Sequence, residues 1–510
     1  MPLVRALSVL AILVVAATSL RAQNDDEAAA ALKDGRYREA LALFERRLEG
    51  ERKDYDDLIG AGTALYRLHE SARAMTYFSM AQGVDRKRPE AFLYLGRIAH
   101  RRAAEKAEAG RVDGETDLHE ALIHLGDAAA RAEDPTVALT EVVDVAMALG
   151  AHERALEAAR RILERDPENE RARAAELAAL YLSGRLEAFV ERSAETGDGS
   201  VLIATRRVEA LARMRRGADV RREFLALVTT ETDRWEPWVA IGNAWSEGEA
   251  MKERLALFEA AREAIPDEEA SIADFYLGYT YALAAYQSGT KDLYARAAEV
   301  FRRYLEGRPD DAIAMRHLAG AELELGRVDV AHEVIRRALE LAPRDPVVRE
   351  QAGYVVAARV AARDFERALS LHEVILAATP EDHALRRDQG SLLKELGRLE
   401  ETEAIMVALI ERDDVDRVTR SRYLNDLALC RAGLGRPEEE LETLRRSLEV
   451  DADNLDAREN LGVALIERGD AGEAAVQLAR VVEAAEADGG EPRWRARYHL
   501  QRARAIAAGR

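Results

Sequence analysis

The stretch that decides the fold is residues 312–345, which read AIAMRHLAGAELELGRVDVAHEVIRRALELAPRD. Apolar residues recur at helical spacing on both sides of Gly326, and a glycine ends a helix where the backbone must adopt a positive φ. Pro343 stops the second helical stretch because proline has no N–H to donate. These 34 residues therefore predict two antiparallel helices joined by a tight turn.

The same unit recurs in both directions along the chain. An interval of 34 residues separates four pairs of matching positions: Ala40 and Ala74, Ala121 and Ala155, Ala297 and Ala331, and Pro309 and Pro343. The alanines fall where two helices of a pair should meet, because a small side chain permits close approach of the helix axes. A constant period of this length is typical of a repeat array.

The unit resembles the tetratricopeptide repeat. That family has a 34-residue helix-turn-helix with an aromatic residue and a Leu-Gly pair in the first helix, an alanine and an aromatic in the second, and a closing proline. Matching residues are Phe92, Leu95 and Gly96; Trp238, Ile241 and Gly242; Leu277 and Gly278; Leu461 and Gly462; and, in second helices, Tyr37, Phe44, Phe78 and Phe301. The resemblance implies an all-α fold, a right-handed superhelical solenoid of about thirteen antiparallel helix pairs.

The phase of the repeats predicts how the chain is divided. A signal peptide (1–22) precedes an N-terminal block (23–185) of about four to five repeats, with an insertion near 104–117 that lacks apolar periodicity and predicts a loop. No Ala, Gly or Pro keeps the expected phase in residues 186–234, which predicts degenerate repeats or a boundary. A C-terminal block of about seven repeats (235–490) and a basic capping helix (491–510) follow.

The N-terminal segment indicates export. Arg5 precedes an apolar run from Val9 to Ala17, and small residues follow, which is the order of regions in a secretory signal. We expect a periplasmic or extracellular protein; the alternative is an uncleaved segment that anchors the chain to a membrane, although this run is short of the roughly 20 residues that a span needs. The single cysteine, Cys430, excludes an internal disulfide and is expected to be buried in its apolar helix.

Charge narrows the class of partner. The chain has 74 basic and 94 acidic side chains, a net charge of −20, and nucleic acid is a poor partner because phosphate binding needs clustered Lys and Arg. A protein or peptide partner is expected, with a basic one as a candidate. The last 20 residues hold six Arg and one Glu, which predicts a helix that caps the array or, alternatively, meets anionic lipid. The sequence leaves the oligomeric state open.

Catalytic and cofactor motifs are absent from the sequence. It has no phosphate-binding P-loop, no dinucleotide loop after a strand and no nucleophile elbow. His119 and His124 lie five residues apart, roughly 140° around a helix, whereas a zinc pair needs a spacing of four. We therefore expect no cofactor, no metal and no catalytic residues; the alternative is an enzyme whose site is built from scattered helix faces.

One region is rich in aromatic residues. Twelve of the 28 lie between residues 235 and 304, where an even distribution would give about four. By the family pattern, Trp238, Trp245 and Tyr281 should pack inside the repeat. The residues expected to face the concave groove as a peptide site are Phe275, Tyr276 and Tyr279, with Arg316 and His317 on the next first helix as polar anchors for a carboxylate. The alternative is that these rings only fill a bulky junction between repeats.

These observations favour an exported, noncatalytic scaffold or adaptor that binds a protein or peptide through its groove. A membrane-tethered component of envelope assembly or polysaccharide export is the second interpretation, since the N-terminus and the basic C-terminal helix are two routes to a membrane.

Overall fold

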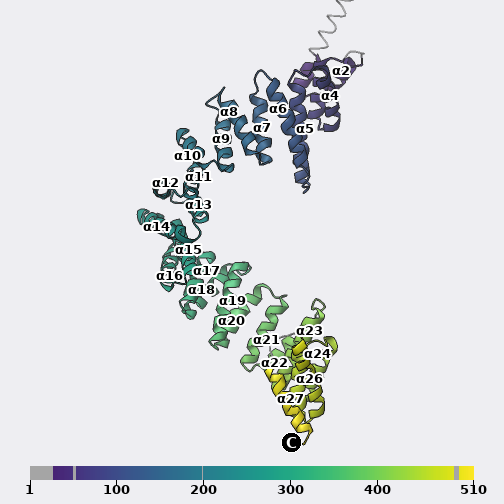
Figure 1. Cartoon of the computed structure of the whole chain (residues 1–510), viewed down its shortest axis with the longest axis vertical. Coiled ribbons are helices and arrows are strands. Elements are labelled where there is room, and N and C mark those ends of the chain that lie inside the picture. The colour runs from purple at the N-terminus through teal and green to yellow at the C-terminus, as the bar shows by residue number, and fades with distance from the viewer. Residues whose placement is uncertain (1–26, 50–52, 198, 488–492, 510) are drawn as a thin grey trace, which may run out of the picture. The chain divides into compact units, whose positions relative to one another are not determined.

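Consecutive antiparallel helices make up the computed structural model of the chain (Figure 1). The structure describes residues 27–49, 53–197, 199–487 and 493–509, and no strand occurs among them. The expected signal peptide (1–22) lies outside the described residues. Within those four ranges, no helix has both the length and the apolar character that crossing a bilayer requires. The fold is the all-α solenoid that the sequence predicts.

The chain divides into two units, Met1–Leu227 and Val228–Arg510. The division falls inside residues 186–234, where the sequence loses the phase of the repeats. Each unit is described by itself.

In the first unit, a helix at residues 27–33 is followed by helices that pair with their neighbours in the chain. Their bounds are α2 (Tyr37–Arg47), α3 (Tyr55–Arg67), α4 (Ser71–Val84), α5 (Glu90–Glu108), α6 (Glu115–Arg131), α7 (Thr136–Ala148), α8 (His152–Leu163), α9 (Glu170–Leu182), α10 (Leu186–Glu195) and α11 (Val201–Arg213), with α12 (Gly217–Thr230) crossing into the second unit.

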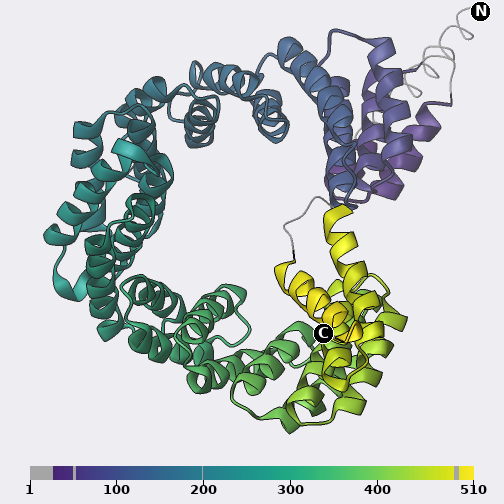
Figure 2. The same cartoon turned by 60° about the horizontal axis from the view of Figure 1, so that its bottom comes forward.

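In the second unit, each helix again lies against the next one along the chain (Figure 2). The elements are α13 (Glu236–Ala244), α14 (Gly248–Ala264), the 3-10 turn η1 (Asp267–Glu269), α15 (Ser271–Ser288), α16 (Lys291–Gly307), α17 (Ala312–Glu324), α18 (Val328–Leu341), α19 (Pro346–Ala361), α20 (Phe365–Ala378), α21 (His383–Glu395), α22 (Leu399–Ile410), α23 (Arg417–Gly433), α24 (Pro437–Val450), α25 (Leu455–Arg468), α26 (Ala471–Ala487) and α27 (Trp494–Ala507).

The turn expected at Gly326 is present. Its φ is 75°, its N–H donates to the Leu323 carbonyl at 2.9 Å, and the next N–H donates to the Glu322 carbonyl at 2.8 Å. This bonding ends α17 and lets α18 begin at Val328. Arg215 makes the same turn at a φ of 59° without glycine, so the pair α11 and α12 forms where the sequence has lost its phase.

Small residues allow the helices of a pair to approach closely. Ala331 is fully buried, and a Cβ added at Gly96 or Gly462 would overlap Leu125 or Leu478 of the facing second helix. The buried side chains form successive clusters, for example one over α2–α5 and another over α23–α27, in place of one central core. Stability is therefore distributed along neighbouring repeats.

The expected loop at the first insertion is wrong over most of its length. α5 continues to Glu108 and α6 begins at Glu115, so the extra residues lengthen two helices instead. The buried Asp117 joins them, because its carboxylate contacts Lys106 Nζ at 2.6 Å and Arg102 Nη2 at 2.8 Å. Ala, Glu and Lys are strong helix formers, and they make this segment helical without an apolar period.

Helix α27 packs on the last repeat through Ala496, Leu500 and Ala503, which are buried with residues of α25 and α26. Ala507, expected on the same side, is exposed. Three of the tail's arginines pair with the body: Arg493 with Asp456 and Arg497 with Glu486, both at 2.7 Å, and Arg495 with Glu459 at 3.6 Å.

Candidate partner-binding site

A difference in helix length opens a pocket in the second unit. α13 has 9 residues and α15 has 18, so α15 is about twice as long at roughly 1.5 Å per residue. Near the end of α15, the Gln287 side chain donates to the Ser246 carbonyl at 2.9 Å, in the turn that follows α13. The first helices α13, α15 and α17 leave a pocket of about 560 Å³ beside this turn, which we call the aromatic pocket.

The residues that the sequence predicts for a binding site come together here. Phe275, Tyr276, Tyr279 and His317 line the aromatic pocket. Arg316 instead lines an adjacent pocket of about 580 Å³, which shares Tyr279 and His317 with it. The remaining lining residues of the aromatic pocket are Trp238, Val239, Gly242, Asn243, Ser246, Arg254 and Leu283.

The aromatic rings pack on one side and stay open on the other. Trp238 is 1% exposed and stacks on Tyr276 with ring centroids 6.2 Å apart, while Phe275 lies 5.5 Å from Tyr304. Phe275 and Tyr276 are half-buried, whereas Tyr279 is 37% exposed. The rings therefore fill the junction between repeats and also present a face to solvent.

His317 is a neutral member of the pocket. Its ring stacks on Phe301 at 5.5 Å, and its Nε2 accepts a hydrogen bond from Arg316 Nη2 at 2.7 Å. Burial, reinforced by the charge of Arg316, lowers the pKa of His317 to about 3. Of the two anchors that the sequence predicts, Arg316 alone is therefore cationic at neutral pH; it forms no ion pair among the described residues.

Arg254 is a pocket residue that the sequence analysis missed. It follows Gly242 by 12 residues, the interval that separates Gly62 from Ala74 and Gly462 from Ala474, so it occupies the small-residue position of its repeat. It is 2% exposed, and its Nη1 donates to the Gly242 carbonyl at 3.2 Å. Burial lowers the pKa of Arg254 to about 10, which leaves it charged at neutral pH. The repeat phase alone would have identified it.

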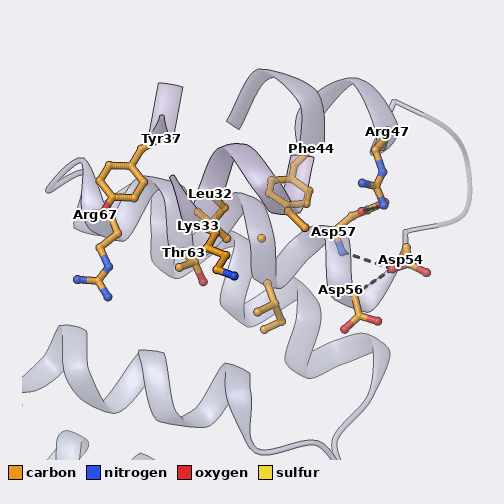
Figure 3. Close-up of a pocket in the computed structure, with 13 residues that line it drawn as sticks. Leu32, Lys33, Tyr37, Phe44, Arg47, Asp54, Asp56, Asp57, Thr63 and Arg67 are labelled. Atoms are coloured by element: carbon orange, nitrogen blue, oxygen red, sulfur yellow. Dashed lines mark hydrogen bonds and ion pairs between the residues drawn. The ribbon is translucent and has the colours of Figure 1, made fainter. Parts of the chain in front are cut away.

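The first unit holds a different pocket of about 760 Å³, shown in Figure 3, which we call the charged pocket. Arg47 in this pocket forms an ion pair with the buried Asp57. Asp54 precedes α3 and accepts hydrogen bonds from the backbone N–H groups of Asp56 at 2.9 Å and Asp57 at 3.4 Å. The carboxylates of Asp54 and Asp57 in the charged pocket thus already have partners within the protein.

The described residues do not form a metal or thiol site. No group of three His, Cys, Asp or Glu side chains in this part of the chain is placed to hold a metal ion. His119 is exposed, and its Nδ1 lies 2.9 Å from the Glu115 carbonyl oxygen. Cys430 is buried and donates to the Leu399 carbonyl at 3.0 Å; burial raises the pKa of its thiol, which disfavours the reactive thiolate.

Comparisons with known proteins match the repeat over two stretches of the chain. The family model described as "Tetratricopeptide repeat" matches residues 281–346 and 425–492. A comparison with curated proteins finds no match.

Three solved structures illustrate the similarity, all with low TM-scores. Naa15/Naa10 bound to HypK-THB is 12% identical, with 96% of each chain covered and a TM-score of 0.33. MamA from Desulfovibrio magneticus is 18% identical over 34% of this chain and 96% of its own, with a TM-score of 0.29. YrrB, titled a TPR protein with an unusual peptide-binding site, is 21% identical over 36% of this chain and 92% of its own, with a TM-score of 0.28.

Proposed function

We propose that this chain, which is a tetratricopeptide-repeat protein, is a noncatalytic scaffold that binds a protein or peptide partner through the aromatic pocket. Repeats of this family generally serve as protein-interaction modules. The observation that carries the proposal is that Phe275, Tyr276, Tyr279 and His317 line one pocket on first helices and that Tyr279 remains exposed. Aromatic rings supply large contact area at interfaces, and tyrosine adds a polar tip.

The shape of this surface favours an extended segment as the ligand. The aromatic pocket and its neighbour share Tyr279, Leu283 and His317, and the neighbour is continued by Tyr286 and Tyr354, which are 78% and 55% exposed. A segment of several residues can therefore contact both pockets at once. A small molecule would fill one of them.

Affinity capture from the native cell tests this function. The double variant Phe275→Ala and Tyr279→Ala should lose the partner that the wild-type chain retains, because two ring contacts are removed from the pocket. Leu202→Ala is the matched control, since Leu202 is a 62% exposed apolar side chain on α11 of the first unit, outside the pocket. Circular dichroism should show the same helical content for all three proteins. Undiminished capture by a folded double variant contradicts the proposal.

Export is part of the proposed function and is supported by the order of regions in residues 1–22. The mature chain should appear in the periplasmic or extracellular fraction and should lack these residues on N-terminal sequencing. An intact N-terminus in the membrane fraction would favour the membrane-anchored alternative.

One observation favours the second candidate function, a membrane-tethered envelope component. Trp494 and Tyr498 of α27 are 75% and 59% exposed, beside the arginines of the same helix. Aromatic and basic side chains together are typical of helices that bind the membrane interface. Binding to anionic vesicles that is lost with Trp494→Ala and Tyr498→Ala would support this function, whereas equal binding by the variant would exclude α27 as the attachment.

A further inference from the structure

Arg254 brings a buried charge to a position that holds alanine in repeats of standard phase. A guanidinium has five N–H donors, and among the described residues this one uses a single side-chain hydrogen bond, to the Gly242 carbonyl. Its Nε is buried without a hydrogen-bond partner. The ring centroids of Phe258 and Tyr279 lie 5.3 Å and 5.9 Å from Arg254 Cζ, so among the described residues the charge faces rings and no carboxylate.

Two other arginines of the second unit, one buried and one with a 13% exposed side chain, have acidic partners. Arg262, on the same helix as Arg254, contacts the buried Asp274 at 2.6 Å. Arg359, which is 5% exposed, contacts Asp364 at 2.9 Å. A buried cation is costly unless an anion compensates it. Arg254 thus lacks the compensation that these two arginines have.

The missing partner can approach from the aromatic pocket. A Cβ at Gly242 would lie 3.4 Å from Cζ and Nη2 of Arg254, so the absence of a side chain there leaves this edge of the guanidinium open. Asn243 and Ser246 line the same pocket and offer further donors. Among the described residues that line it, none is acidic, although the chain has 94 acidic side chains.

We propose that Arg254 anchors a carboxylate of the bound partner segment, held between the guanidinium and the aromatic rings of the pocket. This inference rests on the proposed function, since it specifies the chemistry of the same ligand. The carboxylate takes the uncompensated donors of Arg254, and apolar or aromatic neighbours in the segment contact Phe275, Tyr276 and Tyr279. Arg316 lies along the adjacent pocket and favours further acidic residues. The site therefore selects an acidic segment, although the chain as a whole is acidic.

A random peptide library with free carboxyl ends, selected on the full chain, tests this site. The affinity of the selected peptides should fall by about tenfold or more on Arg254→Ala, the loss expected for a charge-assisted hydrogen bond. Gly242→Ala keeps the charge but covers it, so it should weaken the same peptides. Leu202→Ala, on α11 and outside the pocket, is the control that should bind normally. Peptides resynthesised with Glu→Gln and Asp→Asn, or with an amidated end, distinguish a side-chain carboxylate from a terminal one.

The outcomes separate this inference from the proposed function. Peptides that lose binding on Phe275→Ala with Tyr279→Ala, yet bind Arg254→Ala as tightly as wild type, would overturn the carboxylate site and leave the aromatic site standing. A selection that yields no peptide dependent on these rings would contradict both. Hydrogen exchange of α13 and α14 in Arg254→Ala, at least as slow as in wild type, shows that lost binding does not come from unfolding.

Discussion

The charged pocket and the aromatic pocket each contain an arginine, and they differ in whether an acidic side chain of the protein compensates its charge. In the charged pocket, Arg47 pairs with Asp57 of the facing helix, and the protein supplies both charges. In the aromatic pocket, Arg254 has a carbonyl and rings around it and no acidic lining residue among those described. A charge that the fold already compensates serves stability, whereas a charge that the fold leaves uncompensated is available to a ligand.

Removing Arg47 should have the largest effect on stability. Arg47→Ala leaves the buried Asp57 without its ion-pair partner, and losing one partner of a buried pair costs about 3 kcal/mol or more. Hydrogen exchange of α2 and α3 should accelerate accordingly. Arg67→Ala is the control, because Arg67 lines the same pocket but is exposed, and its loss should change stability by less than about 0.5 kcal/mol. Equal effects of the two variants would show that the pair does not stabilise this pocket.

Acid should lower the stability of the repeats that form the aromatic pocket. The folded pKa of His317 is about 3, below the ordinary value of 6.5, so the unfolded chain binds more protons between these values. The stability that His317 contributes is therefore fully present above pH 6.5 and is lost as the pH falls toward 3. From about pH 6.5 to pH 5 the loss should be about 2 kcal/mol, because one pKa unit corresponds to ~1.4 kcal/mol.

The measurement is the urea midpoint of the helical signal at both pH values for wild type and His317→Gln. The variant cannot titrate at this position and should lose less stability in acid. An identical acid loss in wild type and His317→Gln would assign the effect to other groups.

Arg254→Ala should raise stability, which is the opposite sign to Arg47→Ala. The variant removes an uncompensated buried charge and restores the alanine of the repeat, and we expect a gain of about 1 kcal/mol after the cavity cost. Exchange in α13 and α14 should slow. Arg262→Ala on the same helix should instead destabilise, because Arg262 pairs with Asp274 and Asp267. A loss in both variants would mean that Arg254 is structural, like Arg262.

The sequence predicts the helix pairs because their requirements are local. Gly326 must take a positive φ and Ala331 must be small, so both appear at a constant period. That Phe275 and Tyr279 lie together is also predictable, since both belong to a visible excess of rings in the sequence. The sequence analysis missed Arg254 because an arginine at the alanine position of a repeat can be recognised only after the repeats are aligned.

Other features depend on distances that no periodicity encodes. Burial and the charge of Arg316 keep His317, which the sequence predicts as a polar anchor, neutral, and this follows from how α17 packs on the neighbouring rings. The pocket itself depends on α13 ending well before α15 does. The lengthening of α5 and α6 was missed because ion pairs to Asp117 stabilise it, without an apolar stripe.

The smallest effect on stability should come from glycine replacement in the aromatic pocket. A Cβ at Gly242 would lie 3.4 Å from the guanidinium, an ordinary contact, and alanine is the better helix former by about 0.5–1 kcal/mol, so Gly242→Ala should leave stability equal or slightly higher. The matched change Gly60→Ala in the charged pocket should destabilise by about 1–3 kcal/mol, because its Cβ would overlap the buried Phe44 ring. Thermal unfolding of both variants checks this contrast. A Gly242→Ala protein as damaged as Gly60→Ala would mean that the space over Arg254 is already filled by the protein, and the open edge assigned to the ligand would not exist.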